Sequence, residues 1–93
     1  MFDKKGFYEG QWKNNRRNGE GFYYWQNGDK YEGSYSKGKR EGKGTYYFKS
    51  GEIYLGNWSN DLRNGFGTIL DNKGKIIFEG EWKNDKMIPS KNK

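Results

Sequence analysis

The sequence contains no cysteine and no histidine, and it has a single proline. Without cysteine there is neither a disulfide framework nor a thiolate metal site. Without histidine the chain lacks the commonest general base and the commonest metal ligand. No apolar run approaches the length of a membrane span, and the N-terminus MFDKKGFYEG has no apolar segment of the kind found in signal peptides. We therefore expect a soluble cytoplasmic protein with no metal site and no cofactor.

Aliphatic side chains are also scarce. Hydrophobic residues make up 30% of the 93 residues, and aromatic residues alone account for 19%. A chain of this length suffices for one domain but buries only part of its surface on folding. We therefore expect modest stability and a core built from rings rather than from Ile, Leu and Val.

What the sequence does contain is an internal repeat. Tyr8, Tyr31 and Tyr54 recur every 23 residues, and Phe78 follows after 24. The same register repeats a glycine and then a large ring: Gly10, Gly33, Gly56 and Gly80, followed by Trp12, Tyr35, Trp58 and Trp82. We expect a repeat domain over residues 1–85, with units starting near 8, 31, 54 and 78, and a basic tail over 86–93.

Each unit has the pattern of a β-hairpin. Aromatic and polar residues alternate with a period of two, turn residues separate the runs, and no window has a sustained helical period. The predicted two-residue loops within the hairpins are Asn15-Arg16, Gly38-Lys39 and Asp61-Leu62. Between hairpins we expect three-residue loops at 26–28 and 49–51, each ending in a glycine with positive φ, and a four-residue loop at 72–75.

These loops predict an all-β fold, a single-layer, twisted antiparallel meander of about seven strands with three columns on one face. The first column is Tyr8, Tyr23, Tyr31, Tyr46, Tyr54, Ile69 and Phe78. The second is all glycine: Gly10, Gly21, Gly33, Gly44, Gly56, Gly67 and Gly80. The third alternates rings with glycine: Trp12, Gly19, Tyr35, Gly42, Trp58, Gly65 and Trp82. We expect each ring of the third column to lie flat over the bare backbone of a glycine, and the sheet to curl.

The pattern Tyr-x-Gly-x-Trp followed by Gly-x-Gly, at a 23-residue period, resembles the MORN (membrane occupation and recognition nexus) repeat over about residues 6 to 84. The resemblance implies an elongated all-β sheet with an aromatic groove that serves as a scaffold or adaptor. It also implies an association with cytoskeletal or ciliary assemblies, membrane junctions or acidic phospholipids. Two departures are that Tyr35 replaces Trp and that the fourth unit breaks off at residues 82–85.

The candidate partner-binding residues lie in the third column and beside it. They are Trp12, Tyr35, Trp58, Trp82, Arg17, Arg40 and Arg63. Rings and arginines on one face suit carboxylates or phosphates and cation–π contacts. The alternative is that the columns are the structural code of the repeat and that the arginines form a solvated edge.

No catalytic residues are predicted. Gly42-x-Gly44 lacks the third glycine of a dinucleotide fingerprint, and Glu9, Glu32 and Glu79 are separated by intervening strands. We therefore expect that the chain is not an enzyme.

Three functions remain open. The first is a scaffold that binds a helix or an extended segment of a protein partner in the aromatic groove. The alternative is peripheral binding to anionic phospholipid or phosphoinositide through the basic rim, helped by the net charge of +6. The third and least favoured ligand is single-stranded nucleic acid, since basic residues interleaved with aromatic residues also describe a stacking platform. Open sheet edges also predict edge-to-edge self-association, and an apolar opposite face containing Phe7, Tyr24 and Tyr47 is the reserve docking surface.

Overall fold

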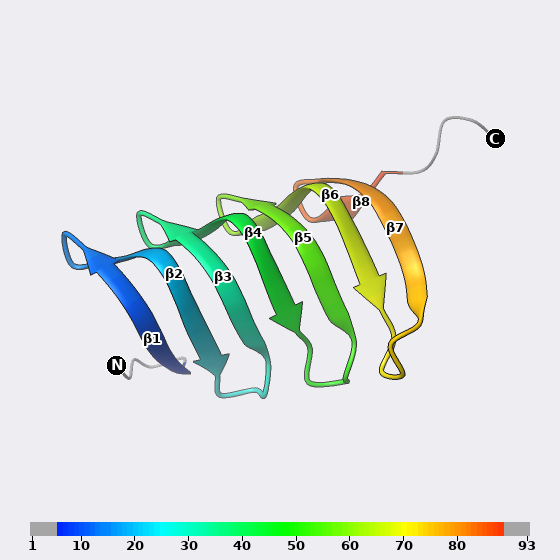
Figure 1. Cartoon of the computed structure of the whole chain (residues 1–93), viewed down its shortest axis with the longest axis horizontal. Helices are drawn as coiled ribbons and strands as arrows, with labels where there is room; N and C mark the ends of the chain where they lie inside the picture. The colour runs from blue at the N-terminus through cyan, green and yellow to red at the C-terminus, as the bar shows by residue number, and fades with distance from the viewer. Residues whose placement is uncertain (1–5, 89–93) are drawn as a thin grey trace.

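The computed structural model describes residues 6–88, which form one open antiparallel sheet (Figure 1). Its strands are β1 (Gly6–Lys13), β2 (Arg16–Trp25), β3 (Lys30–Ser36), β4 (Lys39–Tyr47), β5 (Ile53–Ser59), β6 (Leu62–Leu70), β7 (Ile76–Lys83) and β8 (Lys86–Met87). Each strand pairs with the next one in sequence. The prediction of an all-β, single-layer meander is confirmed.

The sheet has a short eighth strand that the sequence pattern did not predict. Across the turn Asn84-Asp85, Trp82 pairs with Met87 and Lys83 with Lys86. The Ile88 amide then donates to the Glu81 carbonyl at 2.9 Å. Residues 86–88, which the sequence analysis assigned to the tail, therefore extend the ladder of the fourth hairpin; the remainder of that tail lies outside the described residues.

The first two predicted columns are confirmed at every strand pair. In the tyrosine column the cross-strand neighbours are Tyr8↔Tyr23, Tyr23↔Tyr31, Tyr31↔Tyr46, Tyr46↔Tyr54, Tyr54↔Ile69 and Ile69↔Phe78. In the glycine column they are Gly10↔Gly21, Gly21↔Gly33, Gly33↔Gly44, Gly44↔Gly56, Gly56↔Gly67 and Gly67↔Gly80. The central part of the sheet therefore has the register that the repeat predicts.

The hairpin tips differ from the prediction, because each tight turn begins one residue earlier. The two central residues have positive φ in every case: Asn14-Asn15, Lys37-Gly38, Asn60-Asp61 and Asn84-Asp85. Two positive φ values define a type I′ turn, whose twist matches that of the flanking strands and which favours Asn, Asp and Gly. The predicted loops Asn15-Arg16, Gly38-Lys39 and Asp61-Leu62 are therefore wrong by one position.

A β-bulge in each of the first three hairpins compensates for the earlier turn. Within the third hairpin, Trp58 lies opposite Arg63, and the register shifts between Trp58 and Gly56. Gly65 lies on the bulged strand with a φ of 100°, a value that disfavours any side chain. Gly19 and Gly42 have φ values of 86° and 85° at the corresponding positions. The predicted pairing of ring with glycine therefore fails within hairpins, although it holds between them, as in Gly65↔Trp82.

The loops between hairpins follow one design. Gly28 and Gly51 both have a φ of 103°, as the predicted three-residue loops require. After Asp71 the loop is of the same kind, because Gly74 donates to the Asp71 carbonyl at 3.0 Å and Asp71 to the Lys75 carbonyl at 2.8 Å. The predicted four-residue loop is wrong. The extra residue is accommodated by an irregularity in the β6–β7 ladder, where Leu70 pairs with Ile76.

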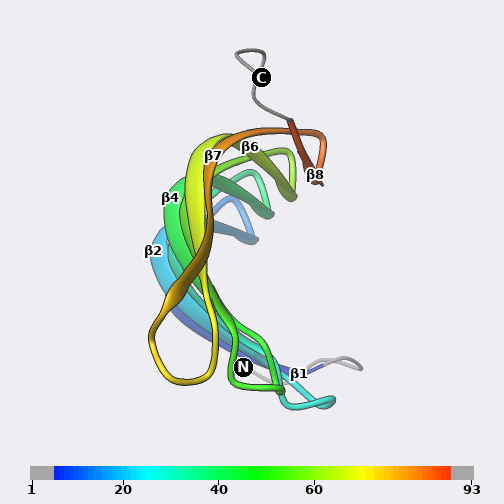
Figure 2. The ribbon, with the colours of Figure 1, turned by 90° about the vertical axis from the view of Figure 1, so that its right-hand side faces the viewer.

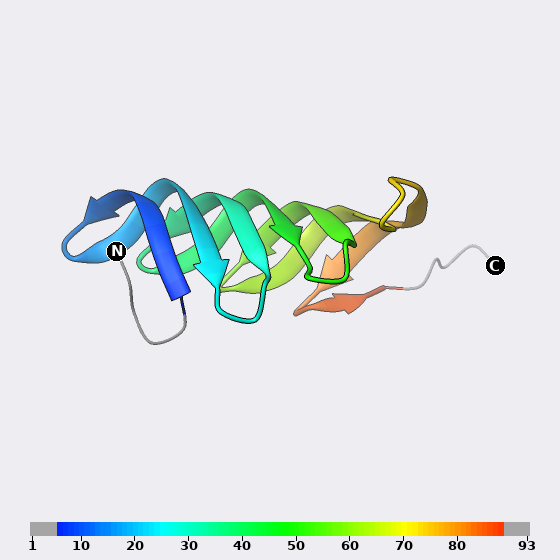
Figure 3. The same cartoon turned by 90° about the horizontal axis from the view of Figure 1, so that it is seen from below.

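The sheet curls into a trough (Figure 2) and twists along its length (Figure 3). Arg40, at the tip end of β4, lies 5.4 Å from the ring of Trp25, which is at the opposite end of β2. Such contacts between the two ends of the hairpins require the face that carries these side chains to be the inner face. We call this concave face, which carries the three columns, the trough, and the other the convex face.

Candidate functional site

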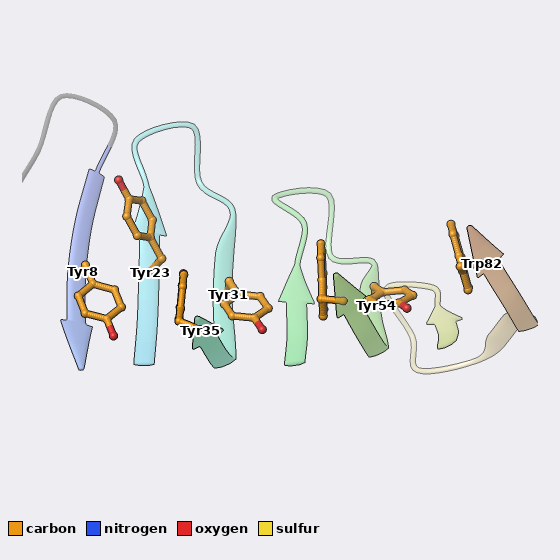
Figure 4. Packing of buried hydrophobic residues seen from close by; sticks show 7 residues of the cluster. Tyr8, Tyr23, Tyr31, Tyr35, Tyr54 and Trp82 are labelled. Atoms are coloured by element: carbon orange, nitrogen blue, oxygen red, sulfur yellow. The ribbon is translucent and has the colours of Figure 1, made fainter. Parts of the chain in front are cut away.

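A continuous row of rings runs along the trough, and Figure 4 shows the part of it between Tyr8 and Trp82. Its eight members, in spatial order, are Trp12, Tyr8, Tyr35, Tyr31, Trp58, Tyr54, Trp82 and Phe78. Neighbouring centroids are 5.0 to 5.5 Å apart and the planes cross at 80 to 89°. Edge-to-face contacts of this kind bring the positive edge of one ring to the negative face of the next. Six of the seven buried core residues within 6–88 belong to this ring ladder, and the seventh, Tyr23, lies beside Tyr8.

Three of the four tyrosines of the ladder are also held by a hydrogen bond of their hydroxyl group. The hydroxyls of Tyr8, Tyr31 and Tyr54 donate to main-chain carbonyls three residues further on, at 2.8, 3.0 and 2.9 Å. Their rings lie across the glycine column, because a Cβ added at Gly44 would fall on the ring of Tyr31. Burial also raises the pKa of Tyr54 to about 12, so its phenol remains a neutral donor at neutral pH.

The predicted flat packing of the third-column rings over Gly19, Gly42 and Gly65 is wrong. A Cβ added at Gly65 would meet the side chain of Asn57 rather than a ring, and these glycines serve the positive φ of the bulges. The rings that cover bare backbone are the tyrosines on the second column. The prediction that rings pack over glycines is correct, but the glycines involved are those of the second column and not those of the third.

The third-column rings differ in exposure. Tyr35, Trp58 and Trp82 are only 5%, 5% and 3% exposed, whereas Trp12, on the outer strand, is 45% exposed. The indole N–H groups of Trp58 and Trp82 donate to the carbonyls of Gly44 and Gly67, both at 3.3 Å. Three of the four predicted binding rings are therefore part of the core, and Trp12 has the largest accessible surface among them.

Tyr35 fills a tryptophan position imperfectly. Its ring takes its place in the ladder between Tyr8 and Tyr31. Its hydroxyl, however, is buried with no hydrogen-bond partner among the described residues. Burial raises the pKa of this phenol above its ordinary value. An unsatisfied buried hydroxyl destabilises the fold, because it has lost its water without gaining a partner.

The arginines lie on the trough side, as predicted, and they join successive hairpins. The guanidinium carbon of Arg40 is 4.5 Å from the Trp58 ring centre, and that of Arg63 is 4.5 Å from the Trp82 ring centre. Arg40 Nε and its backbone N–H both donate to Asp61 Oδ1, at 3.0 and 2.8 Å. Each of these arginines therefore packs on the ring of the following hairpin and binds the turn of that hairpin.

The pair formed by Arg63 and Asp85 repeats this arrangement at the last turn. Arg63 Nε donates to Asp85 Oδ1 at 2.7 Å, and its Nη2 donates to the Asp85 carbonyl at 3.3 Å. Burial tends to raise the pKa of Asp85, but the hydrogen bonds and charge of Arg63 outweigh it, and the pKa lies below its ordinary value. Asp61 and Asp85 were missed by the sequence analysis, although they recur at one repeat position.

A groove opens in the trough next to these ion pairs. It has a volume of about 180 Å³ and is lined by Arg40, Tyr46, Phe48, Trp58, Asp61, Arg63 and Asp85. Half-buried rings extend its apolar floor, since Tyr46 lies 5.2 Å from Trp25 and 4.8 Å from Phe48. Trp25 and Phe48 were not predicted as site residues, although they are 23 residues apart and so share a repeat position.

A second hollow lies at the first two hairpin tips and is strongly basic. It has a volume of about 620 Å³, and its lining residues are Lys13, Asn14, Arg16, Asn18, Ser36 and Lys37. The lining contains three cationic residues and no carboxylate. It therefore concentrates positive charge at one end of the sheet.

Within residues 6–88 there is no group of three or more acidic side chains placed to hold a metal ion. In the same range no helix is long and apolar enough to cross a membrane. The site thus consists of a curved surface of rings, ion pairs and basic tips.

Fold and site together define the class: a single-sheet repeat protein in which equivalent hairpins are joined through a ring ladder and Arg contacts. The family model of the MORN repeat matches residues 8–30, 31–53, 54–75 and 78–87. These four segments cover most of the chain, and the protein belongs to the MORN repeat family. A sequence search of curated proteins found no significant match.

Proposed function

We propose that this protein is a non-catalytic scaffold that holds a helical or extended segment of a protein partner in the trough. The observation that supports this function is the groove beside Arg40 and Arg63, which combines an aromatic floor with two ion pairs at its rim. Interface anchors are enriched in Trp, Tyr and Arg held in well-packed surroundings. The ring ladder supplies a rigid support for such anchors, which lowers the entropic cost of binding.

Phe48 offers the clearest test, because it lines the groove and is not part of the ring ladder. Partners would be captured from a cell lysate with the intact chain and identified by mass spectrometry. The Phe48→Ala substitution should weaken the binding free energy of the captured partner by about 2 kcal/mol, the contribution of an interface hot spot. Thermal unfolding must show that the variant is folded.

The matched control is Phe66→Ala, because Phe66 is exposed and lies on the convex face. This control should leave affinity within about 0.5 kcal/mol of the unchanged protein. If Phe66→Ala weakens the partner and Phe48→Ala does not, binding takes place on the convex face and the proposal fails.

A second candidate function is binding to an anionic membrane surface. It is favoured by the basic hollow at the first two tips, where Lys13, Arg16 and Lys37 have no carboxylate among the lining residues. Each basic residue near an anionic surface contributes about 1 kcal/mol. Changing these three residues to Gln should therefore nearly abolish sedimentation of the protein with phosphatidylserine vesicles. High salt should likewise nearly abolish sedimentation of the unchanged protein, because it screens the attraction between the charges. Binding that persists in the triple variant would count against this function.

Substitutions of Arg40 and Arg63 would not separate these two functions. Both arginines hold neighbouring turns together, so their replacement would disturb the trough itself. The cytoskeletal or ciliary setting that the family resemblance implies is part of the scaffold proposal and depends on the identity of the captured partner.

A further inference from the structure

The second, third and fourth hairpin tips provide an internal comparison at the same repeat position. At the third and fourth tips, Oδ1 of an aspartate accepts hydrogen bonds from the backbone N–H and the Nε of the preceding arginine. At the second tip Gly38 occupies the aspartate position. It offers Arg17 only its carbonyl oxygen, which accepts from Nη2 at 2.8 Å. The carboxylate is therefore missing from an arrangement that otherwise repeats.

Arg17 is nevertheless held in the same way as the other two arginines. Its carbonyl accepts from the Gly38 N–H at 2.9 Å, as the Arg40 carbonyl does from Asp61 at 3.1 Å. Its guanidinium carbon lies 5.2 Å from the Tyr23 ring centre and 5.4 Å from that of Tyr35. Among residues 6–88, Arg17 forms no ion pair. The site has fixed donors but no counter-ion.

The position of the missing carboxylate is accessible. The side chains of Asp61 and Asp85 are 44% and 45% exposed, so the equivalent space beside Gly38 opens to solvent. A Cβ built on Gly38 would meet no atom within 4 Å. Lys37, the residue that precedes Gly38 in the turn, adds a further positive charge. An external anion can therefore reach this position and is attracted to it.

We propose that Arg17 binds the carboxylate of an Asp or Glu side chain from the protein segment that occupies the trough. Nε–H and the backbone N–H of Arg17 are the donors, because the corresponding donors of Arg40 converge on one carboxylate oxygen. That internal precedent favours a carboxylate over a phosphate. The scaffold function proposed above supplies the source of the carboxylate; the site itself depends only on the geometry of Arg17 and the second tip.

Acetate is the probe for the site. In the full chain, the Nε–H and backbone amide signals of Arg17 should shift saturably in NMR spectra as sodium acetate is added at constant ionic strength. The same signals of Arg40 and Arg63 should not shift, because their carboxylate positions are filled. If acetate leaves Arg17 unchanged, or if inorganic phosphate alone shifts it, a carboxylate site is excluded.

The Gly38→Asp substitution would place a carboxylate of the protein itself in the anion site beside Arg17. The turn tolerates this change, since Asp61 and Asp85 occupy the same position with φ values of 71° and 75°, close to the 85° of Gly38. The variant should unfold at a higher temperature than the unchanged protein, and its Arg17 signals should no longer respond to acetate. Gly38→Ala is the matched control, because it adds a Cβ without a carboxylate and should keep the acetate response. Loss of the response in both variants would contradict the proposal.

The partner assay separates this inference from the scaffold function. Gly38→Asp should weaken a captured partner roughly tenfold, the effect of one charge-assisted hydrogen-bonded contact, whereas Gly38→Ala should not. A partner that binds both variants equally well would leave the scaffold function in place and overturn the carboxylate contact. If no partner binds the trough while acetate still saturates Arg17, the scaffold function fails and the anion site stands.

Discussion

Both faces of this sheet carry apolar side chains, but the burial of these side chains differs greatly. Of the residues that the structure describes, seven hydrophobic ones are buried, and all are on the trough face: Tyr8, Tyr23, Tyr31, Tyr35, Tyr54, Trp58 and Trp82. On the convex face, Phe22, Leu55 and Phe66 remain exposed. A flat single-layer sheet would expose both faces to solvent to the same extent. The difference shows that curvature here replaces the second layer that most domains use to bury a core.

Glycine makes this curvature compatible with large rings. Pairs such as Gly33↔Gly44 leave bare backbone under the ring of Tyr31, which then lies along the sheet and shields it from water. The convex face has no equivalent column. The following substitutions, each paired with one on the convex face, test whether stability resides in the trough.

The largest effect is expected from Tyr31→Ala. Tyr31 is fully buried and touches both Tyr35 and Trp58 in the ring ladder. Its loss should lower the free energy of unfolding by about 3 to 5 kcal/mol, as for other buried aromatic residues. Phe66→Ala on the convex face should change it by no more than about 0.5 kcal/mol. Urea unfolding of the two variants measures both values, and equal losses would show that the trough is not the core.

Gly44→Val should have the next largest effect. A branched side chain there would collide with the Tyr31 ring, which its hydrogen bond to the Ser34 carbonyl holds in place. We expect a loss of roughly 1 to 3 kcal/mol, the usual cost of overpacking. Lys43→Val introduces the same side chain one residue earlier, on the convex face, and should be nearly neutral. An unchanged unfolding midpoint for Gly44→Val would rule out the packing of rings on the glycine column.

Tyr35→Phe should have the smallest effect and the opposite sign. It removes the buried hydroxyl that lacks a partner while keeping the ring between Tyr8 and Tyr31. We expect a gain of about 1 kcal/mol in the free energy of unfolding. Tyr47→Phe on the convex face removes a hydroxyl with a distant contact to Glu32, at 3.5 Å, and should have almost no effect. A destabilised Tyr35→Phe variant would mean that the hydroxyl is satisfied in solution.

The fold class and the central register could be predicted because both depend on a period of 23 residues, with one insertion before Phe78. With Tyr8, Tyr31 and Tyr54 in one column, a shift by a single residue would move every ring to the other face. The three-residue loops ending in Gly28 and Gly51 also followed, since their geometry preserves that register. In a repeat protein the pairing of distant strands can thus be predicted from the spacing of residues along the chain.

The tips were predicted less well because the bulges shift the pairing by two residues, which preserves the face of each side chain. Alternation alone cannot detect such a shift. A signal was nevertheless present: Asn14-Asn15 and Asn60-Asp61 are residue pairs that favour two successive positive φ values. Placing the turns there would have brought Arg40 close to Asp61 and revealed the ion pairs. The degree of curling, which decides that Trp58 is buried, depends on the packing of many rings and has no local signature.

The regular spacing of the arginines limits which ligand conformations can contact more than one of them. Arg17, Arg40 and Arg63 each lie two strands apart, a pitch of roughly 9 to 10 Å. An extended chain advances about 3.3 Å per residue, so three of its residues span one pitch. An α-helix advances about 1.5 Å per residue and needs six or seven. The number of residues between two ligand side chains that bind successive arginines therefore indicates whether the ligand lies along the sheet as an extended strand or as a helix.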